Sequence, residues 1–347
     1  MPLSTFNSDE AERTVPISVT GQPSGMQISA KAGIIWLLTG LGVIFLGLEL
    51  SSPVILAHLS NTERRITGEM RQAQALQPTT QDGRPTVLLL GNSLLLEGVQ
   101  LEDLQNDLAS QYAVSRLGIE QTHYLDWYFG IRRLLAEGSH PNLIVLSLAT
   151  DQLASPLSLG ESFAHRQMLA RDLPLVVHES NLDRTVESSY FFAHWSDWLG
   201  DKGFIRQCVM ILLVPHFRQL AGRIADHDPR VDDPSVLLSQ ARRRLPELRE
   251  LAQKYQVHVV LLVPPTLHED HSMEIQELGN ELDVPVWVLS PPGEFPRQLF
   301  RDGFHLNAQG SQIFTARLAQ KIRDRLSDQM VRRNTCPTLM EVGSCAE

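Results

Sequence analysis

A long apolar run near the N-terminus constrains this chain more than any other feature of the sequence. Residues 33–48 carry no charge, Glu49 interrupts the run, and apolar residues continue through 53–57. A membrane-spanning helix needs about 20 mostly apolar residues, and a lone carboxylate is tolerated near the membrane interface. The run therefore predicts a transmembrane helix over 33–57, and the alternative is a buried core helix.

A cleaved signal peptide explains this run less well. Signal peptides place a short basic segment before the apolar core and small residues at a cleavage site after it. Residues 1–32 are instead long, polar and rich in Ser, Thr, Gly and Pro. This composition is typical of a disordered tail.

The basic residues around the helix bear on its orientation. Arg13 and Lys31 precede it, whereas Arg64, Arg65 and Arg71 follow it. Because cytoplasmic flanks are enriched in Lys and Arg, this distribution leans toward a cytoplasmic location for the C-terminal side.

Charge and cysteine content exclude several classes of protein. The formal net charge is -10 at pH 7, which does not suit binding to nucleic-acid phosphates, so no nucleic-acid partner is expected. Three cysteines exclude a disulfide-dense scaffold and a four-cysteine metal site. Cys336 and Cys345 could pair in an oxidising compartment, but their spacing leaves this open.

After Pro85 the pattern changes to short apolar runs separated by amphipathic stretches. Four runs have the length and composition of buried parallel strands, at 86–90, 142–148, 257–263 and 284–289. Helices are predicted near 100–110, at 236–255 and at 308–327. Alternating strands and helices predict an α/β domain with a parallel sheet covered on both faces.

These patterns predict the organisation of the whole chain. The expected parts are a disordered tail over 1–32, a transmembrane helix over 33–57, a linker over 58–83, an α/β domain over 84–330 with a helical insertion over 155–235, and a C-terminal tail over 331–347.

Two apolar features fall within the predicted insertion. The run over 208–214 is too short to span a membrane, and we expect it to pack in a core, with contact to a membrane surface or partner as the alternative. An aromatic cluster is expected to form a small hydrophobic core, although such rings also stack on sugars. Its members are Tyr190, Phe191, Phe192, Trp195 and Trp198.

Candidate catalytic residues follow the first predicted strand and precede the last helix. Ser93 stands in a Gly-Asn-Ser turn, where a strand-to-helix bend can present its hydroxyl. Asp302 and His305 are three residues apart, so the carboxylate can orient the imidazole. Parallel strands place their carboxyl ends at one edge of a sheet, which brings these groups within reach of each other.

The segments 87–93 and 302–310 resemble the first and last sequence blocks of the SGNH/GDSL hydrolase superfamily. The resemblance covers about 84–327 and implies a flavodoxin-like three-layer α/β/α domain. It also implies Ser93 as nucleophile, His305 as general base and Asp302 as the acid that orients it. The Ser93 amide would be the first oxyanion donor.

The middle blocks depart from the family pattern. Gly118 occupies the place of the family's glycine block and is a candidate second oxyanion donor. Where the family often has Gly-x-Asn-Asp, this chain has Ala-Thr-Asp-Gln at 149–152, so Thr150 or Gln152 would have to donate in place of the asparagine. Asn92 stands where aspartate is more usual, and we expect it at the substrate rim.

A His-Glu-Asp-His sequence at 268–271 follows the third predicted strand. Its spacing does not match a helical zinc motif, so neither a metal nor a cofactor is expected. The family places this loop near the catalytic edge, which makes His268 and His271 candidates for the substrate rim. A solvated loop without a role in substrate binding is the alternative.

The membrane helix together with these blocks resembles membrane-anchored SGNH proteins of surface-polymer modification, such as alginate O-acetylation proteins. The resemblance implies a domain outside the cytoplasmic membrane, against the charge distribution, and a multi-spanning acyltransferase partner. The leading hypothesis is O-acetylation of a cell-surface polysaccharide through a serine acyl-enzyme. The alternatives are an esterase or deacetylase that uses the same residues, and a non-catalytic scaffold.

Overall fold

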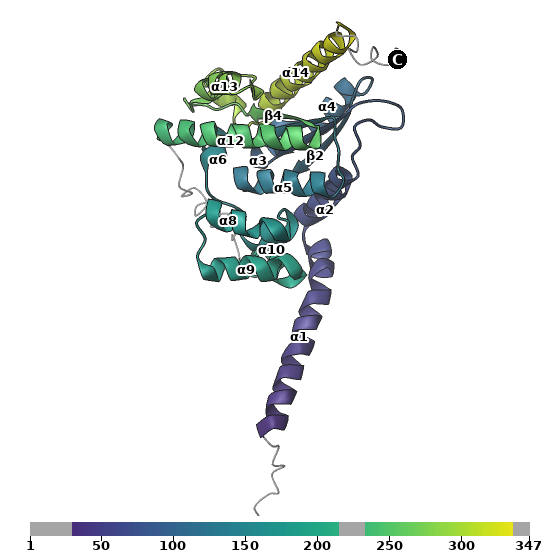
Figure 1. Ribbon diagram of the computed structural model, residues 1–347, viewed down its shortest axis with the longest axis vertical. Coiled ribbons are helices and arrows are strands. Elements are labelled where there is room, and N and C mark those ends of the chain that lie inside the picture. The colour runs from purple at the N-terminus through teal and green to yellow at the C-terminus, as the bar shows by residue number, and fades with distance from the viewer. Residues whose placement is uncertain (1–29, 215–232, 336–347) are drawn as a thin grey trace, which may run out of the picture. The chain divides into compact units, whose positions relative to one another are not determined.

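The computed structural model describes residues 30–214 and 233–335 (Figure 1). The chain divides into two compact units, Met1–Gly47 and Leu48–Glu347. Most of the predicted N-terminal and C-terminal tails, as well as Cys336 and Cys345, lie outside the described residues.

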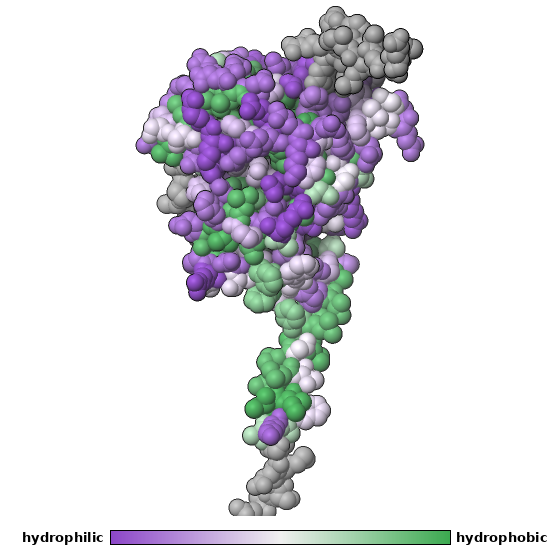
Figure 2. All heavy atoms as spheres, in the orientation of Figure 1, coloured by the Kyte–Doolittle hydropathy of each residue, from purple (hydrophilic) through white to green (hydrophobic). Residues whose placement is uncertain are grey.

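The predicted membrane helix is part of one continuous helix, α1 (Ala30–Leu59). Its best 18-residue window has a mean hydropathy of 2.0 and none of that window is buried. At 1.5 Å per residue the helix is about 45 Å long, which exceeds the roughly 30 Å hydrocarbon core of a bilayer. Most side chains in its first half are hydrophobic on the face seen in Figure 2, with a hydrophilic one near its start. By length and composition, α1 is able to cross a membrane.

The second unit is built on a five-stranded parallel sheet in the order β2-β1-β3-β4-β5. This is the flavodoxin-like strand order. The strands are β1 (Thr86–Gly91), β2 (Ala113–Gly118), β3 (Leu143–Ser147), β4 (His258–Val263) and β5 (Val286–Val288).

Four of the strands coincide with the predicted apolar runs, but β2 was not predicted. It lies at the edge of the sheet and includes Ser115 and Arg116, which are only half-buried. An edge strand pairs on one side only and tolerates polar residues. It therefore lacks the continuous apolar signature that identified the other four strands.

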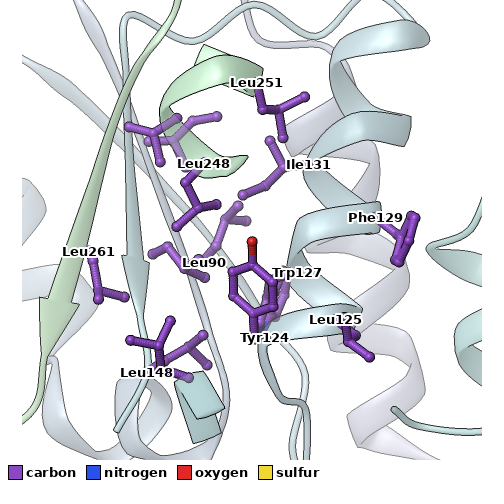
Figure 3. Packing of buried hydrophobic residues seen from close by; sticks show 14 of the residues in the cluster. Leu90, Tyr124, Leu125, Trp127, Phe129, Ile131, Leu148, Leu248, Leu251 and Leu261 are labelled. Atoms are coloured by element: carbon purple, nitrogen blue, oxygen red, sulfur yellow. The ribbon is translucent and has the colours of Figure 1, made fainter. Parts of the chain in front are cut away.

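Helices cover both faces of the sheet because successive residues of each strand point to opposite sides. Leu88 and Leu90 of β1 belong to one hydrophobic cluster, and Val87 and Leu89 belong to the other. Figure 3 shows the first cluster, where Tyr124 and Leu248 lie near Leu90. The helices around the sheet are α2 (Asn61–Gln74), α3 (Ser93–Gly98), α4 (Leu101–Leu108), α5 (Tyr124–Ala136), α6 (Thr150–Ala154), α12 (Pro234–Tyr255), α13 (Ser272–Glu281) and α14 (Ala308–Thr335), with 3-10 turns η1 (Ala170–Asp172) and η2 (Arg297–Leu299).

The prediction of a linker over 58–83 is wrong for α2, which is part of the domain. Ile66 and Ala73 on this helix are buried in the core cluster, and Met70 packs against it. The Glu69 carboxylate accepts hydrogen bonds from the Gly118 N–H at 2.8 Å and from Arg116 at 2.9 Å, both on β2. The apolar spacing of α2 is helical, but its polar composition concealed that it packs on the sheet.

The segment predicted as a helical insertion contains α7 (Glu161–Arg166), α8 (Leu173–Glu179), α9 (Arg184–Trp195) and α10 (Asp197–Leu213). The expectation of a core position for the 208–214 run is wrong, since Val209, Leu212 and Leu213 are exposed. The aromatic cluster is also not a core: Tyr190 is buried, whereas Phe191, Phe192 and Trp195 are exposed. Small and polar residues, such as Ala193, Gly200 and Asp201, instead occupy buried faces of these helices.

A buried carboxylate joins the start of this insertion to α5. The Asp126 side chain accepts hydrogen bonds from the backbone N–H of His123 and of Leu159, each at 2.8 Å. Although these bonds favour the charged form, burial dominates and raises the pKa of Asp126 to about 7.

This raised pKa predicts a stability that declines with pH. Between about pH 4 and 7 the folded chain holds a proton on Asp126 that the unfolded chain has released, so raising the pH through this window destabilises the fold. The limiting slope is about 1.4 kcal/mol per pH unit. In urea titrations of the detergent-solubilised chain, the stability advantage of the wild type over Asp126→Asn should therefore be larger at pH 5 than at pH 8. Exposed Asp103→Asn is the matched control, and a difference independent of pH would contradict the prediction.

Candidate active site

Ser93 is the first residue of α3, directly after β1. The turn before it requires a glycine, because a Cβ on Gly91 would lie 2.8 Å from the Ser147 carbonyl oxygen and 2.9 Å from the Leu95 Cβ. After Gly91 the chain turns at Asn92 into α3. The bend places the Ser93 hydroxyl at the carboxyl edge of the sheet, where open α/β sheets bind ligands.

The structure brings Ser93, His305 and Asp302 together in one hydrogen-bonded chain. The Nε2 atom of His305 lies 3.0 Å from Ser93 Oγ, and its Nδ1 atom lies 2.8 Å from Asp302 Oδ2. His305 and Ser93 are 212 residues apart in sequence. The loop before α14 therefore places the imidazole at the end of β1, between Ser93 and Asp302, as the sequence predicted.

Hydrogen bonds favour the ionised form of the Asp302 side chain. Its Oδ1 atom accepts the backbone N–H of Phe304 at 3.0 Å and of His305 at 2.7 Å. Partial burial works in the opposite direction, but these bonds and the His305 ring hold the pKa of Asp302 well below its usual range. An ionised Asp302 accepts the Nδ1 proton of His305, which leaves Nε2 free to accept the proton of the Ser93 hydroxyl.

Asn92 does not lie at the substrate rim, which corrects the prediction from the sequence. Its side chain is 1% exposed, and its Oδ1 atom caps α3 by accepting the Leu94 N–H at 3.0 Å. Its Nδ2 group donates to the Thr122 carbonyl at 2.9 Å and to Gln152 Oε1 at 2.7 Å. Both of these partners are acceptors, so an amide satisfies the position and an ionised aspartate would not.

Gly118 is not an oxyanion donor, because its N–H already donates to the Glu69 carboxylate. A Cβ at this position would lie 2.5 Å from a methyl carbon of Leu96, so a larger residue would require the Leu96 side chain to shift. The prediction that Gly118 donates to an oxyanion is therefore wrong, because Glu69 of α2 accepts that hydrogen bond.

Two other donors at this edge remain unused. Gln152 Oε1 accepts both the Asn92 amide and the Ala149 N–H, at 2.7 and 3.0 Å, which orients the Gln152 side chain. Within the part of the chain that the structure describes, neither the Gln152 Nε2 group nor the Ser93 N–H has a hydrogen-bond partner. Thr150 lies beside them as the first residue of α6.

A cavity of about 260 Å³ is lined by sequence neighbours of these groups, although Ser93, Gln152 and His305 do not line it themselves. Thr150 lines it together with His268 and His271, so the structure places both histidines near the catalytic edge, as the rim prediction requires. Leu94 and Phe304, the neighbours of Ser93 and His305, also line the cavity.

The loop around His271 also contains a cluster of groups able to ligate a metal. Ligand atoms of Glu269, His271 and Glu274 lie within 4.8 Å of one another. Both glutamates are exposed, and the Nδ1 atom of His271 already lies 3.1 Å from Glu274 Oε1. A hydrogen-bonded surface pair accounts for this cluster without an ion.

No protein-family model matches the sequence, and no curated protein matches it. Among solved structures, the chain is similar to TesA at 13% identity, over 67% of this chain and 95% of that one, with a TM-score of 0.34. It is also similar to the lipase Lip_vut3 from a goat rumen metagenome at 13% identity, with the same coverage and a TM-score of 0.26. The flavodoxin-like assignment rests on the strand order and helix placement described above.

The contacts of Asn92 predict a strong effect of a nearly isosteric change. Asn92→Asp turns a donor of two hydrogen bonds into a carboxylate that faces the Thr122 carbonyl and Gln152 Oε1. We expect a loss of about 1–3 kcal/mol in unfolding free energy, measured by urea titration at pH 7. Asn106→Asp on the exposed face of α4 makes the same chemical change and should be near neutral. Equal stabilities of the two variants would contradict the role of Asn92.

Proposed function

We propose that this chain is an SGNH-type enzyme that transfers an acyl group through a Ser93 acyl-enzyme. The observation that carries the proposal is the hydrogen-bonded chain from Ser93 Oγ through His305 to Asp302. His305 Nε2 takes the Ser93 proton as Oγ attacks the acyl carbonyl, and then returns it to the departing alcohol. In the second half-reaction His305 deprotonates an incoming hydroxyl, which takes the acyl group and releases Ser93.

The tetrahedral intermediate needs donors for its oxyanion. The unused Ser93 N–H and the Gln152 Nε2 group support an assignment of these two groups to that role. Asn92 acts as a positioning residue, because it holds the Gln152 oxygen and thereby turns the Gln152 amide nitrogen away from itself. The Thr150 hydroxyl is a third candidate beside them, on the rim of the cavity.

We place the protein in the cytoplasmic membrane as a single-pass protein, with its α/β domain outside the cytoplasm. The length and hydropathy of α1 support the anchor. The basic residues after the helix favour the opposite orientation, but one of them, Arg65, has a structural role in the domain. It donates to the Gly118 carbonyl at 2.6 Å and to Glu120 at 2.7 Å. A basic residue needed for packing reports less about topology than a free one.

The acceptor that we propose is a hydroxyl of a cell-surface polysaccharide, acetylated with acyl groups that a multi-spanning acyltransferase supplies. The cavity beside Ser93 has room for one sugar unit. Asp151, Glu269 and Asp270 line it, so an uncharged sugar fits this site better than an acidic one, which would meet like charges.

Hydrolysis of ester-linked acyl groups is the second candidate, since water can replace the sugar hydroxyl in the same mechanism. An assay with p-nitrophenyl acetate separates the two. Faster release of nitrophenol on addition of polysaccharide, with the acetyl group recovered on the polymer, favours transfer. Release that is indifferent to the polymer favours hydrolysis.

The proposal predicts selective labelling of Ser93 by a fluorophosphonate, in which Oγ displaces fluoride from phosphorus. The full-length chain in detergent should gain one adduct by intact mass, and Ser93→Ala should gain none. His305→Ala should react at least about 10²-fold more slowly, because it loses the general base. A folded wild type that does not react would instead favour the non-catalytic scaffold.

The assignment of Gln152 is tested by a substitution that keeps its structural bond. Gln152→Glu retains an oxygen for the Asn92 and Ala149 donors but replaces the free NH2 group with a second oxygen. We expect the rate of p-nitrophenyl acetate turnover to fall about 10²–10³-fold. Thermal unfolding should change little. Unchanged turnover in a folded Gln152→Glu protein would exclude Gln152 as an oxyanion donor.

A further inference from the structure

Helix α9 presents an aromatic stripe on its outer face. The side chains of Phe191, Phe192 and Trp195 are 50%, 58% and 68% exposed, whereas Tyr190 and Ala193 of the same helix are buried. The spacing of the three exposed residues places them on one side of the helix. Large rings gathered on a surface in this way mark an interaction site.

The neighbouring helix α10 adds exposed aliphatic residues to the insertion. Leu212 and Leu213, in its last turn, are 69% and 73% exposed. Figure 2 shows hydrophobic side chains among hydrophilic ones on the part of the domain formed by the insertion. The insertion thus exposes apolar residues on two helices that have no contact with the catalytic cavity.

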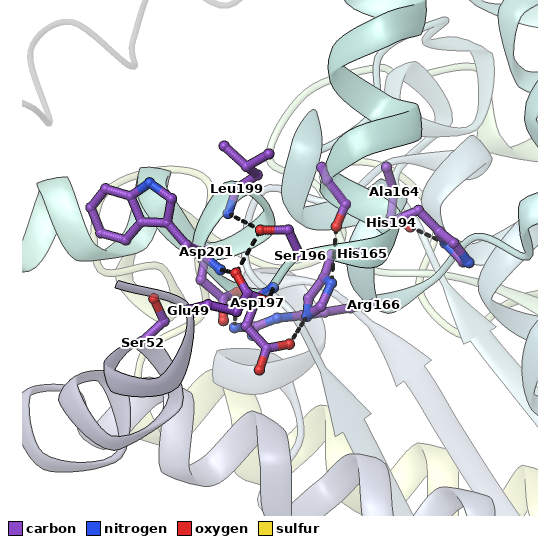
Figure 4. Close-up of polar contacts among 12 residues, drawn as sticks. Glu49, Ser52, Ala164, His165, Arg166, His194, Ser196, Asp197, Leu199 and Asp201 are labelled. Atoms are coloured by element: carbon purple, nitrogen blue, oxygen red, sulfur yellow. Dashed lines mark hydrogen bonds and ion pairs between the residues drawn. The ribbon is translucent and has the colours of Figure 1, made fainter. Parts of the chain in front are cut away.

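A carboxylate of α1 holds the corner between α9 and α10. Glu49 accepts hydrogen bonds from the Ser196 hydroxyl and the Asp197 N–H, each at 2.7 Å, and from the Trp198 N–H at 3.2 Å (Figure 4). Ser196 directly follows Trp195, the last residue of the aromatic stripe. Glu49 is also the residue that ends the charge-free run over 33–48. Trp195 is thus one residue away from a residue that is hydrogen-bonded to Glu49, and Glu49 directly follows the charge-free run.

We infer that the aromatic stripe of α9 docks on the surface of the lipid bilayer that α1 crosses. Two observations identify the bilayer as the surface that the stripe contacts: α1 is one continuous helix, and its Glu49 is bonded to the α9–α10 corner. If residues 33–48 lie in the membrane, Glu49 and the corner bonded to it lie at the membrane interface. Trp and Phe side chains partition into that interface. Since the chain has a net charge of -10, insertion of rings drives the docking, without a need for anionic lipid or low salt.

This inference rests on the proposed anchoring of α1 and is independent of the chemistry at Ser93. The test uses the full chain in nanodiscs of phosphatidylcholine, with and without bromine at carbons 6 and 7 of one acyl chain. The chain has five tryptophans, and subtraction of the emission of Trp195→Phe from that of the wild type isolates Trp195. We expect brominated lipid to remove at least about half of this emission at both low and high salt, because interfacial side chains reach about 5–10 Å into the bilayer.

Trp287, which is buried under α14, supplies the matched control: the emission isolated with Trp287→Phe should not respond to bromine. Trp195 that is unquenched by bromine and open to aqueous acrylamide would overturn the inference. Trp195 shielded from both quenchers would also overturn it, by showing that protein covers the stripe. Quenching of Trp36 in α1, isolated in the same way, reports the anchor separately, and its absence would overturn the anchoring and the docking together.

Discussion

The hydrogen bonds of one buried amide hold the candidate site together. Asn92 caps α3 behind Ser93 and donates to Thr122, which follows β2, and to Gln152, which follows β3. The carboxyl ends of three strands are thus joined by one side chain whose donors and acceptor are all used. In a low-dielectric interior such a satisfied network is rigid, and a partly satisfied one is costly. The position of the serine and that of its neighbouring donor therefore depend on each other.

A second feature of the candidate site is that the lowered pKa of Asp302 keeps its side chain ionised. Two backbone N–H groups and an imidazole converge on this carboxylate before any substrate is present. In the proposed mechanism, the charge that stabilises a protonated His305 is therefore in place before Ser93 attacks and needs no rearrangement. At the end of the neighbouring strand β2, the Glu69 carboxylate accepts the Gly118 N–H, so this N–H is not available to an oxyanion.

Helix α2 makes the segment after α1 part of the α/β domain. Glu63 on this helix pairs with Arg166 of α7 at 2.5 Å, and Arg166 also pairs with Asp201 of α10 at 2.5 Å. Burial raises the pKa of Glu63, while Arg166 opposes this effect. Charges buried in this way are costly unless they are paired, so the network specifies how α2 and the insertion meet. The chain that follows α1 is a structural part of the domain rather than a spacer.

The sequence alone determined strands β1, β3, β4 and β5, the apolar helix and the three residues that meet at the sheet edge, because each depends on local composition or on the parallel topology. Only the tertiary structure decided the roles of Asn92 and Gly118, because each role depends on a hydrogen bond to a residue far away in sequence. These partners are Gln152 for Asn92 and Glu69 for Gly118. The same holds for α9: its sequence shows that aromatic residues are present, but not which of them are buried. Periodicity defines the faces of a helix, and packing against the other helices of the insertion decides which face turns inward.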